Sequence, residues 1–263
     1  MLQIHPVPAF SDNYIWLLYG DDRQAFVVDP GDASPVAAAL AELSLQLAGI
    51  LVTHHHADHT GGIKDLKARF GEVPVYGPVD CPAGGIDHPL RDGDTLNLLG
   101  RAADIIAVPG HTLDHIAYFF PASPQDAAPI LFCGDTLFAG GCGRVFEGTH
   151  PMMLASLSRL AGLPADTRVC CAHEYTLSNL RFARAVEPAN AALEAREQRD
   201  TARRERGEPT VPSTIGLELA TNPFLRCAAA GVRASAAAHC ASELDSSDAV
   251  FAVVRDWKDG FRG

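Results

Sequence analysis

A cluster of metal-ligand residues directly follows an apolar segment near residue 50. The segment Gly49–Val52 has the composition of a strand, and Thr53–His59 then reads Thr-His-His-His-Ala-Asp-His. A neutral imidazole is the commonest metal ligand in proteins, and carboxylate oxygens suit the same divalent ions. The run therefore predicts a strand that ends in a metal-binding loop, and it requires a fold that brings further ligands to that strand end.

The spacing within this loop indicates two ions rather than one. Residues at positions i and i+2 can converge on one ion, while residues at i+4 and i+5 turn to a second. His54 and His56 would then share one metal, and Asp58 and His59 would share the other. The alternative is a histidine-rich loop that chelates weakly, and it predicts no distant ligands.

Three more ligand-type residues follow apolar, strand-like runs elsewhere in the chain: His111, Asp135 and His173. His111 would complete a three-histidine set with the first pair, and His173 would join the second pair. Asp135 could bridge both ions, because its carboxylate has two oxygens. Seven such side chains are too many for one four-coordinate ion, so the pattern predicts a binuclear site.

The remaining histidines receive lesser roles in this interpretation. His55 lies between ligands and is expected to be solvated or to support them indirectly, and His115 could orient a ligand. We expect surface or turn positions for the others, His5, His88, His150 and His239.

The whole chain has the composition of a globular protein with 263 residues and a formal charge of −11. That charge argues against a nucleic-acid partner, because phosphate contacts need clustered Lys and Arg. No segment approaches the roughly 18 apolar residues of a membrane span, and no signal peptide is visible. Seven cysteines without a C-x-x-C pair indicate reduced, buried thiols, so we expect a cytoplasmic protein. We also expect a monomer.

Two regions of the chain differ in their pattern of apolar and polar residues. Residues 1–172 alternate apolar, strand-like runs with turns and helices, which favours a layered α/β domain. One predicted hairpin joins Asn13–Tyr19 to Gln24–Val28. Residues 173–263 indicate a small helical domain, and its apolar stripe predicts one helix from Thr176 to about Arg206.

Together these motifs resemble the metallo-β-lactamase superfamily and, within it, the glyoxalase II (hydroxyacylglutathione hydrolase) family over nearly the full length. The matching segments are 53–59, 134–138, 140–144, 172–176, 212–214 and 222–226. The last two are specific to this branch. The resemblance implies a four-layer αββα sandwich with a C-terminal helical domain.

The resemblance also implies residues that bind glutathione: Arg144, Phe146, Tyr175, Arg255 and Lys258. Two of them depart from the family pattern, since Arg144 replaces a lysine and Phe146 replaces a tyrosine. Arg144 keeps the charge with a different geometry, and Phe146 keeps the ring without the hydroxyl. Ala172 and Asp114 also stand where glycine is usual, and we expect these two changes to be minor.

The implied reaction is hydrolysis of S-D-lactoylglutathione to D-lactate and glutathione, a step of methylglyoxal detoxification. Two ions bridged by a water, with Asp135 holding the bridge, would lower the pKa of that water to about 7 and provide hydroxide. The leaving thiol has a pKa of about 8.5, so it needs no acid beyond Asp58 and metal-bound water.

Three alternatives remain open. A lactonase or another hydrolase on the same scaffold would share every metal ligand and differ in the C-terminal domain. A one-iron persulfide dioxygenase would also use glutathione thiols, and a metal-binding protein would show no turnover. Zinc is the expected metal, while iron or manganese suits the same His and Asp ligands.

Overall fold

The computed structural model describes residues 1–124, 126 and 128–262, and contacts divide the chain into two compact units. Unit 1 comprises Met1–Ala107 and Asp114–Gly134, and unit 2 comprises Val108–Leu113 and Asp135–Gly263. This grouping differs from the expected division at residues 172 and 173, because it joins residues 135–172 to the C-terminal helices.

Unit 1 holds two β-sheets. Its elements are β1 (Gln3–Ala9), β2 (Asn13–Tyr19), β3 (Gln24–Val28), α1 (Ala33–Glu42), β4 (Gln46–Leu51), α2 (Ala57–Thr60), α3 (Ile63–Phe70), β5 (Val75–Pro78), β6 (His88–Leu90), β7 (Thr95–Leu98), β8 (Arg101–Ala107), β9 (Ile116–Phe120) and β10 (Ile130–Gly134). Strands β1 to β6 form a mixed sheet in chain order, in which β1 to β3 are antiparallel and β3 to β6 are parallel. Strands β7 to β10 form an antiparallel second sheet.

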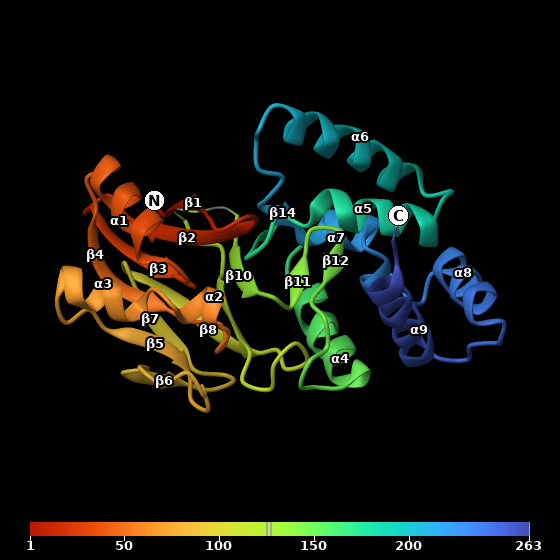
Figure 1. The fold of residues 1–263 in the computed structure, drawn as a ribbon, viewed down its shortest axis with the longest axis horizontal. Helices are drawn as coiled ribbons and strands as arrows, with labels where there is room; N and C mark the ends of the chain where they lie inside the picture. The colour runs from red at the N-terminus through yellow and green to blue at the C-terminus, as the bar shows by residue number, and fades with distance from the viewer. Residues whose placement is uncertain (125, 127, 263) are drawn as a thin grey trace. The chain divides into compact units, whose positions relative to one another are not determined.

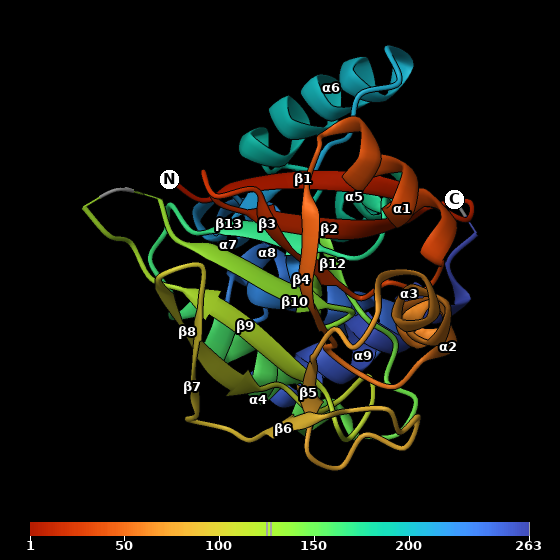
Figure 2. The same cartoon turned by 90° about the vertical axis from the view of Figure 1, so that its left-hand side faces the viewer.

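The two faces of the first sheet are covered by different layers. Helices α1 and α3 lie against one face, where Val36, Leu40 and Leu66 join its apolar side chains in a core (Figure 1; Figure 2 views this side). On the other face Trp16 lies 6.3 Å, between ring centroids, from Phe132 of β10. Burial on both faces explains why β2 is a continuous apolar run rather than an alternating one. The predicted hairpin of β2 and β3 is confirmed.

The sheet topology brings several segments to one edge. Because β3 and β4 are parallel, Asp29 after β3 and Thr53 after β4 lie at the same end of the sheet. The amide of Ile116 donates to the carbonyl oxygen of Thr53 at 2.9 Å, so the start of β9 also reaches this edge. The histidine-rich loop therefore begins at a fixed and hydrogen-bonded position.

Unit 2 is mainly helical. Its elements are β11 (Leu137–Phe138), β12 (Gly141–Cys142), α4 (His150–Ala161), β13 (Arg168–Cys171), α5 (Thr176–Val186), α6 (Ala191–Glu205), β14 (Ser213–Thr214), α7 (Ile215–Thr221), η1 (Pro223–Leu225), α8 (Ala230–Cys240) and α9 (Ser247–Gly260). The core includes Leu180, Ala183 and Leu193, and the ring of Phe224 packs on those of Phe182 and Phe251.

The prediction of one helix over residues 176–206 was wrong. Helix α5 ends at Val186, and α6 begins at Ala191 with Asn190 as its N-cap, whose side chain accepts from the amide of Leu193. Pro188 lies between them, and proline disfavours a helical conformation in the residue before it. The apolar stripe continues across the break because α5 and α6 pack on each other.

Two further expectations can be compared with the structure. All seven cysteines are free thiols, and five of them are buried, as predicted. Among the described residues, no helix is both long enough and apolar enough to span a bilayer.

Candidate metal centre

Unit 1 carries four of the predicted ligands, with His54 and His56 on the loop after β4 and Asp58 and His59 in the short helix α2. His54 Nε2 lies 3.1 Å from His56 Nδ1, and His59 Nε2 lies 3.5 Å from Asp58 Oδ2. The rings of His54 and His59 are 4.1 Å apart between centroids, and both are buried. The loop thus gathers its ligand atoms in one place, with each predicted pair in contact.

Asp29, at the end of β3, is a candidate functional residue that sequence reasoning missed. His59 Nδ1 lies 3.1 Å from Asp29 Oδ2, and Thr53 donates to the same carboxylate through its amide and its hydroxyl, each at 2.7 Å. An ionised carboxylate only accepts, so an Nδ1 proton directed at Asp29 would leave the lone pair of His59 on Nε2. A carboxylate behind a histidine is a common support for a metal ligand. The available signal was an aspartate at the end of the strand parallel to β4.

The same aspartate acts on His54 through Thr53. The Thr53 hydroxyl donates a hydrogen bond to Asp29. Its oxygen is then the acceptor for His54 Nδ1, which lies 3.0 Å away. His54 therefore also presents its Nε2 lone pair. Asp58 is held separately, because Asn13 Nδ2 donates to its Oδ2 at 3.0 Å.

The turn that contains Asp29 packs closely on the histidine-rich loop. A Cβ added at Gly31 would lie 1.9 Å from the carbonyl oxygen of Asp58. Only glycine fits such an approach, which explains the residue type at this position. The turn therefore fixes the distance between Asp29 and the loop.

The two other histidines near this loop lie beside the ligands. His55 Nδ1 lies 2.9 Å from Asp114 Oδ1, so its ring is held by a buried carboxylate. His115 is buried and stacks on His54 with centroids 4.5 Å apart and planes at 13°. His115 thus limits rotation of the His54 ring, in line with an orienting role.

Unit 2 carries the other three predicted ligands, and Asp135 lies between the two histidines. Asp135 Oδ2 is 3.4 Å from His111 Nε2 and 3.4 Å from His173 Nε2. His111 Nδ1 lies 2.9 Å from the carbonyl oxygen of Arg144, so Nδ1 carries the proton and Nε2 presents the lone pair. The ring of Tyr175 stacks on that of His173 at 4.7 Å between centroids. One carboxylate oxygen therefore faces the Nε2 atoms of both histidines.

These distances fit divalent metal ions. Bonds of about 2.0–2.1 Å in a tetrahedral arrangement place neighbouring ligand atoms about 3.3 Å apart. The separations of 3.1 to 3.5 Å within each unit match that spacing. The described donor set of buried and partly buried imidazoles and carboxylates is also the chemistry that such ions require. The spacing of ligand atoms within each unit is thus compatible with metal coordination.

Three predicted substrate-binding side chains lie near the ligands of unit 2 and reach solvent. Phe146 is 61% exposed, and its ring lies 5.2 Å from that of His111. Tyr175 is partly exposed beside His173, and the Arg144 side chain is exposed with its Nε 3.4 Å from Asp259. These three side chains are available to a ligand bound at His111 and His173.

Arg255 is placed differently from that expectation, because it is buried. It is only 3% exposed, and its guanidinium donates to the carbonyl oxygens of Cys142 and Gly143 and to Asp259. It also lies over the ring of Phe224. A direct contact with substrate carboxylates would require these hydrogen bonds to be exchanged.

Lys258 is half-buried in the last turn of α9. Its Nζ donates to the carbonyl oxygen and the hydroxyl of Ser178, at 3.2 and 3.3 Å. Burial, followed by the nearby charges of Arg255 and Arg181, lowers the pKa of Lys258 from 10.5 to about 8. Its positive charge is therefore lost at a lower pH than that of an ordinary lysine.

Comparison with known proteins places the chain in a family. Residues 10–173 match the model of the metallo-beta-lactamase superfamily, and residues 174–261 match that of the hydroxyacylglutathione hydrolase C-terminus. A hydroxyacylglutathione hydrolase of Cupriavidus taiwanensis is 52% identical over 100% of both chains.

Solved structures agree on the fold. The B3 metallo-beta-lactamase BLEG-1 is 25% identical, with a TM-score of 0.64 over 85% of this chain and 99% of its own. The protein TTHA1623, in a di-iron-bound form, is 26% identical with a TM-score of 0.58, over 84% of this chain and 100% of its own. The mixed sheets with flanking helices are therefore a metallo-β-lactamase fold, and the chain belongs to the hydroxyacylglutathione hydrolase family of that superfamily.

Proposed function

We propose that this protein hydrolyses S-D-lactoylglutathione to D-lactate and glutathione, and so acts in methylglyoxal detoxification. The observation that carries the proposal is the full-length similarity to hydroxyacylglutathione hydrolases together with a complete ligand set in both units. The match to the C-terminal family model favours this activity over that of a lactonase.

The proposed cofactor is a pair of divalent ions, with zinc as the expected metal. The first ion takes His54, His56 and His111, the second takes Asp58, His59 and His173, and Asp135 is shared. The sharing across the two units rests on the sequence motifs, while the distances within each unit support each half. The di-iron form of the similar TTHA1623 also supports two ions and keeps iron as a candidate.

Two ions bound there would lower the pKa of a water between them and polarise the thioester carbonyl. Neighbouring groups of the protein orient the histidine ligands. Asp29 fixes the tautomers of His59 and, through Thr53, of His54, while the carbonyl of Arg144 fixes that of His111. Asp58 is held by Asn13 and, with metal-bound water, would serve as the acid that protonates the leaving thiolate. The thiolate needs little acid assistance, since its thiol has a pKa of about 8.5.

Glutathione would be held on unit 2. Arg144 and Lys258 would meet its carboxylates, and Phe146 and Tyr175 would cover its chain. The burial of Arg255 supports an indirect role, in which it holds the carbonyls of Cys142 and Gly143 next to Arg144. An Arg255→Lys variant tests that role, because a lysine keeps the charge but cannot make the forked contacts.

The direct test is the loss of thioester absorbance when lactoylglutathione is added to the purified protein. The proposal predicts rapid loss that a chelator abolishes and added zinc restores. Hydrolysis of lactones but not of this thioester would replace the proposal with the lactonase alternative. Oxygen consumption with glutathione persulfide would point to the dioxygenase.

A further inference from the structure

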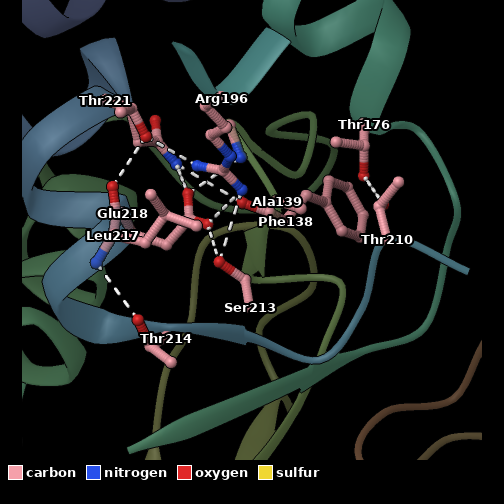
Figure 3. A network of polar contacts seen from close by, with 12 residues as sticks. Phe138, Ala139, Thr176, Arg196, Thr210, Ser213, Thr214, Leu217, Glu218 and Thr221 are labelled. Atoms are coloured by element: carbon pink, nitrogen blue, oxygen red, sulfur yellow. Dashed lines mark hydrogen bonds and ion pairs between the residues drawn. The ribbon is translucent and has the colours of Figure 1, made fainter. Parts of the chain in front are cut away.

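A buried polar network lies in unit 2, and its members come from α6, α7 and the residues beside them (Figure 3). We call it the Glu218 network: Arg196, Asp200, Ser213, Glu218, Thr221 and Asn222. Arg196 is 2% exposed, and its guanidinium donates to Glu218 at 2.6 Å and to Thr221 at 2.6 Å. Asp200 accepts from the same arginine at 3.3 Å. Each buried charge thus has an opposite partner.

The network also reaches the hairpin of β11 and β12. Glu218 Oε2 accepts from the backbone amide of Gly140 at 2.8 Å and from Asn222 Nδ2 at 3.0 Å. Asn222 Nδ2 in turn donates to the carbonyl oxygens of Phe138 and Gly141, at 3.3 and 2.9 Å. The turn of the hairpin is therefore held by side chains that are themselves fixed by Arg196.

Along the chain, the hairpin lies between one candidate metal ligand and a residue whose backbone contacts another. Asp135 stands two residues before Leu137, and Arg144, whose carbonyl orients His111, stands two residues after Cys142. A Cβ added at Gly143 would lie 2.0 Å from the carbonyl oxygen of Asp135, so the two flanks of the hairpin are in close contact. A shift of the hairpin must therefore move Asp135, the Arg144 carbonyl or both.

Burying an ion pair adds little stability compared with well-packed apolar residues, because both charges lose their hydration. A fully satisfied buried network does, however, hold its members in one geometry. Outer-shell partners of metal ligands change metal affinity about 10–100-fold when they are lost. The Glu218 network has the connections that such a partner needs.

We propose that Glu218 and Asn222 are positioning residues, which set the ligand geometry of Asp135 and His111 through the 137–142 hairpin. This inference rests on the proposed metal site. It concerns metal binding, so it can fail or hold independently of which substrate the protein hydrolyses.

The test compares two pairs of variants in the full-length protein. Asn222→Ala removes the hairpin contacts and the cap of η1, while Asn190→Ala removes the cap of α6 and the contacts to Glu187 and Ala220. Glu218→Gln removes the charge at the hairpin, while Glu187→Gln breaks the ion pair with Arg226. The hydrogen bonds described for the two control residues do not reach the hairpin.

Zinc affinity is measured by competition with a chromophoric chelator, at a temperature where each variant is folded. We expect Asn222→Ala and Glu218→Gln to lose at least tenfold in affinity for one zinc ion, and their cobalt forms to show altered d–d absorption. The controls should keep the parental zinc affinity and cobalt spectrum even where their Tm falls as far as that of the test variants. If Glu218→Gln does not fold, Asn222→Ala carries the test. Parental zinc affinity and an unchanged cobalt spectrum in Asn222→Ala would overturn the proposal.

Discussion

The two units differ in how they present the proposed metal ligands. Unit 1 supplies four candidate ligands from six consecutive residues, 54–59. Unit 2 supplies three from residues 111, 135 and 173, which the fold of that unit gathers around one carboxylate. A short segment can present many ligands at once. Asp135, the ligand proposed to be shared, comes instead from unit 2, where the fold brings together residues that are distant in sequence.

The support behind the ligands differs in the same way. In unit 1 a side chain, Asp29, fixes two histidines directly or through Thr53. In unit 2 the backbone carbonyl of Arg144 contacts His111, and buried side chains hold the preceding hairpin of residues 137–142. A single substitution of Asp29 can therefore remove the side chain that supports the ligands of unit 1. In unit 2 a substitution must act on the ligands through the backbone.

The largest effect is expected at the ligand that both ions would share. Asp135→Ala removes the carboxylate between His111 and His173, so binding of both ions should weaken. We expect a loss of at least about 1,000-fold in kcat/KM, since metal ions contribute several kcal/mol of transition-state stabilisation. The measurements are metal content and thioester turnover.

The control for this change is His88→Ala. His88 lies exposed on β6 and stacks on Tyr76, and no predicted ligand contacts it. Its replacement should leave metal content and rate unchanged. A loss of metal in His88→Ala, or retention of two ions in Asp135→Ala, would show that the ligand assignment is wrong.

A smaller effect should follow from Asp29→Asn in unit 1. The amide keeps the shape but removes one acceptor for His59 and Thr53, so we expect metal affinity to fall about 10–100-fold. The KM for the thioester should change little in metal-saturated enzyme, because no substrate contact is proposed in unit 1. Asp32→Asn is the matched control, since Asp32 caps α1 in the same turn and asparagine caps equally well.

Lys258 provides a pH-dependent test of the substrate face of unit 2. Its pKa is lowered to about 8, so the amine is charged below that pH and neutral above it. The KM for lactoylglutathione should therefore rise several-fold as the pH passes from about 7 to 9, because the charge that attracts the carboxylates is lost. Lys258→Arg should delay that rise, and Lys258→Ala should raise KM at pH 7 with metal content unchanged. An identical pH profile in Lys258→Ala would remove this residue from the site.

The smallest effect concerns Phe146. Adding the hydroxyl that the family pattern has at this position should contribute one hydrogen bond to glutathione, worth about 0.5–1.5 kcal/mol. Phe146→Tyr should lower KM several-fold with little change in kcat, the pattern of altered uniform binding. A raised KM would instead mean that the exposed ring has repacked.

Much of the site could be predicted from sequence, because the histidine-rich loop is local and each distant ligand follows an apolar strand. Asp29 could not be found in this way, since its role depends on β3 lying parallel to β4. The burial of Arg255 was hidden as well, because its helix face gave no sign of the Cys142 and Gly143 carbonyls. The helix break at Pro188 was missed because the apolar stripe runs across it, although the proline itself was a usable signal.

The proposed function depends on two metal ions bound per chain. The most direct test is the metal content of protein purified without chelator, measured by elemental analysis alongside thioester turnover. A binuclear centre predicts close to two equivalents of metal per chain, with activity that rises and falls with the second equivalent. A stable value near one equivalent at full activity would contradict it.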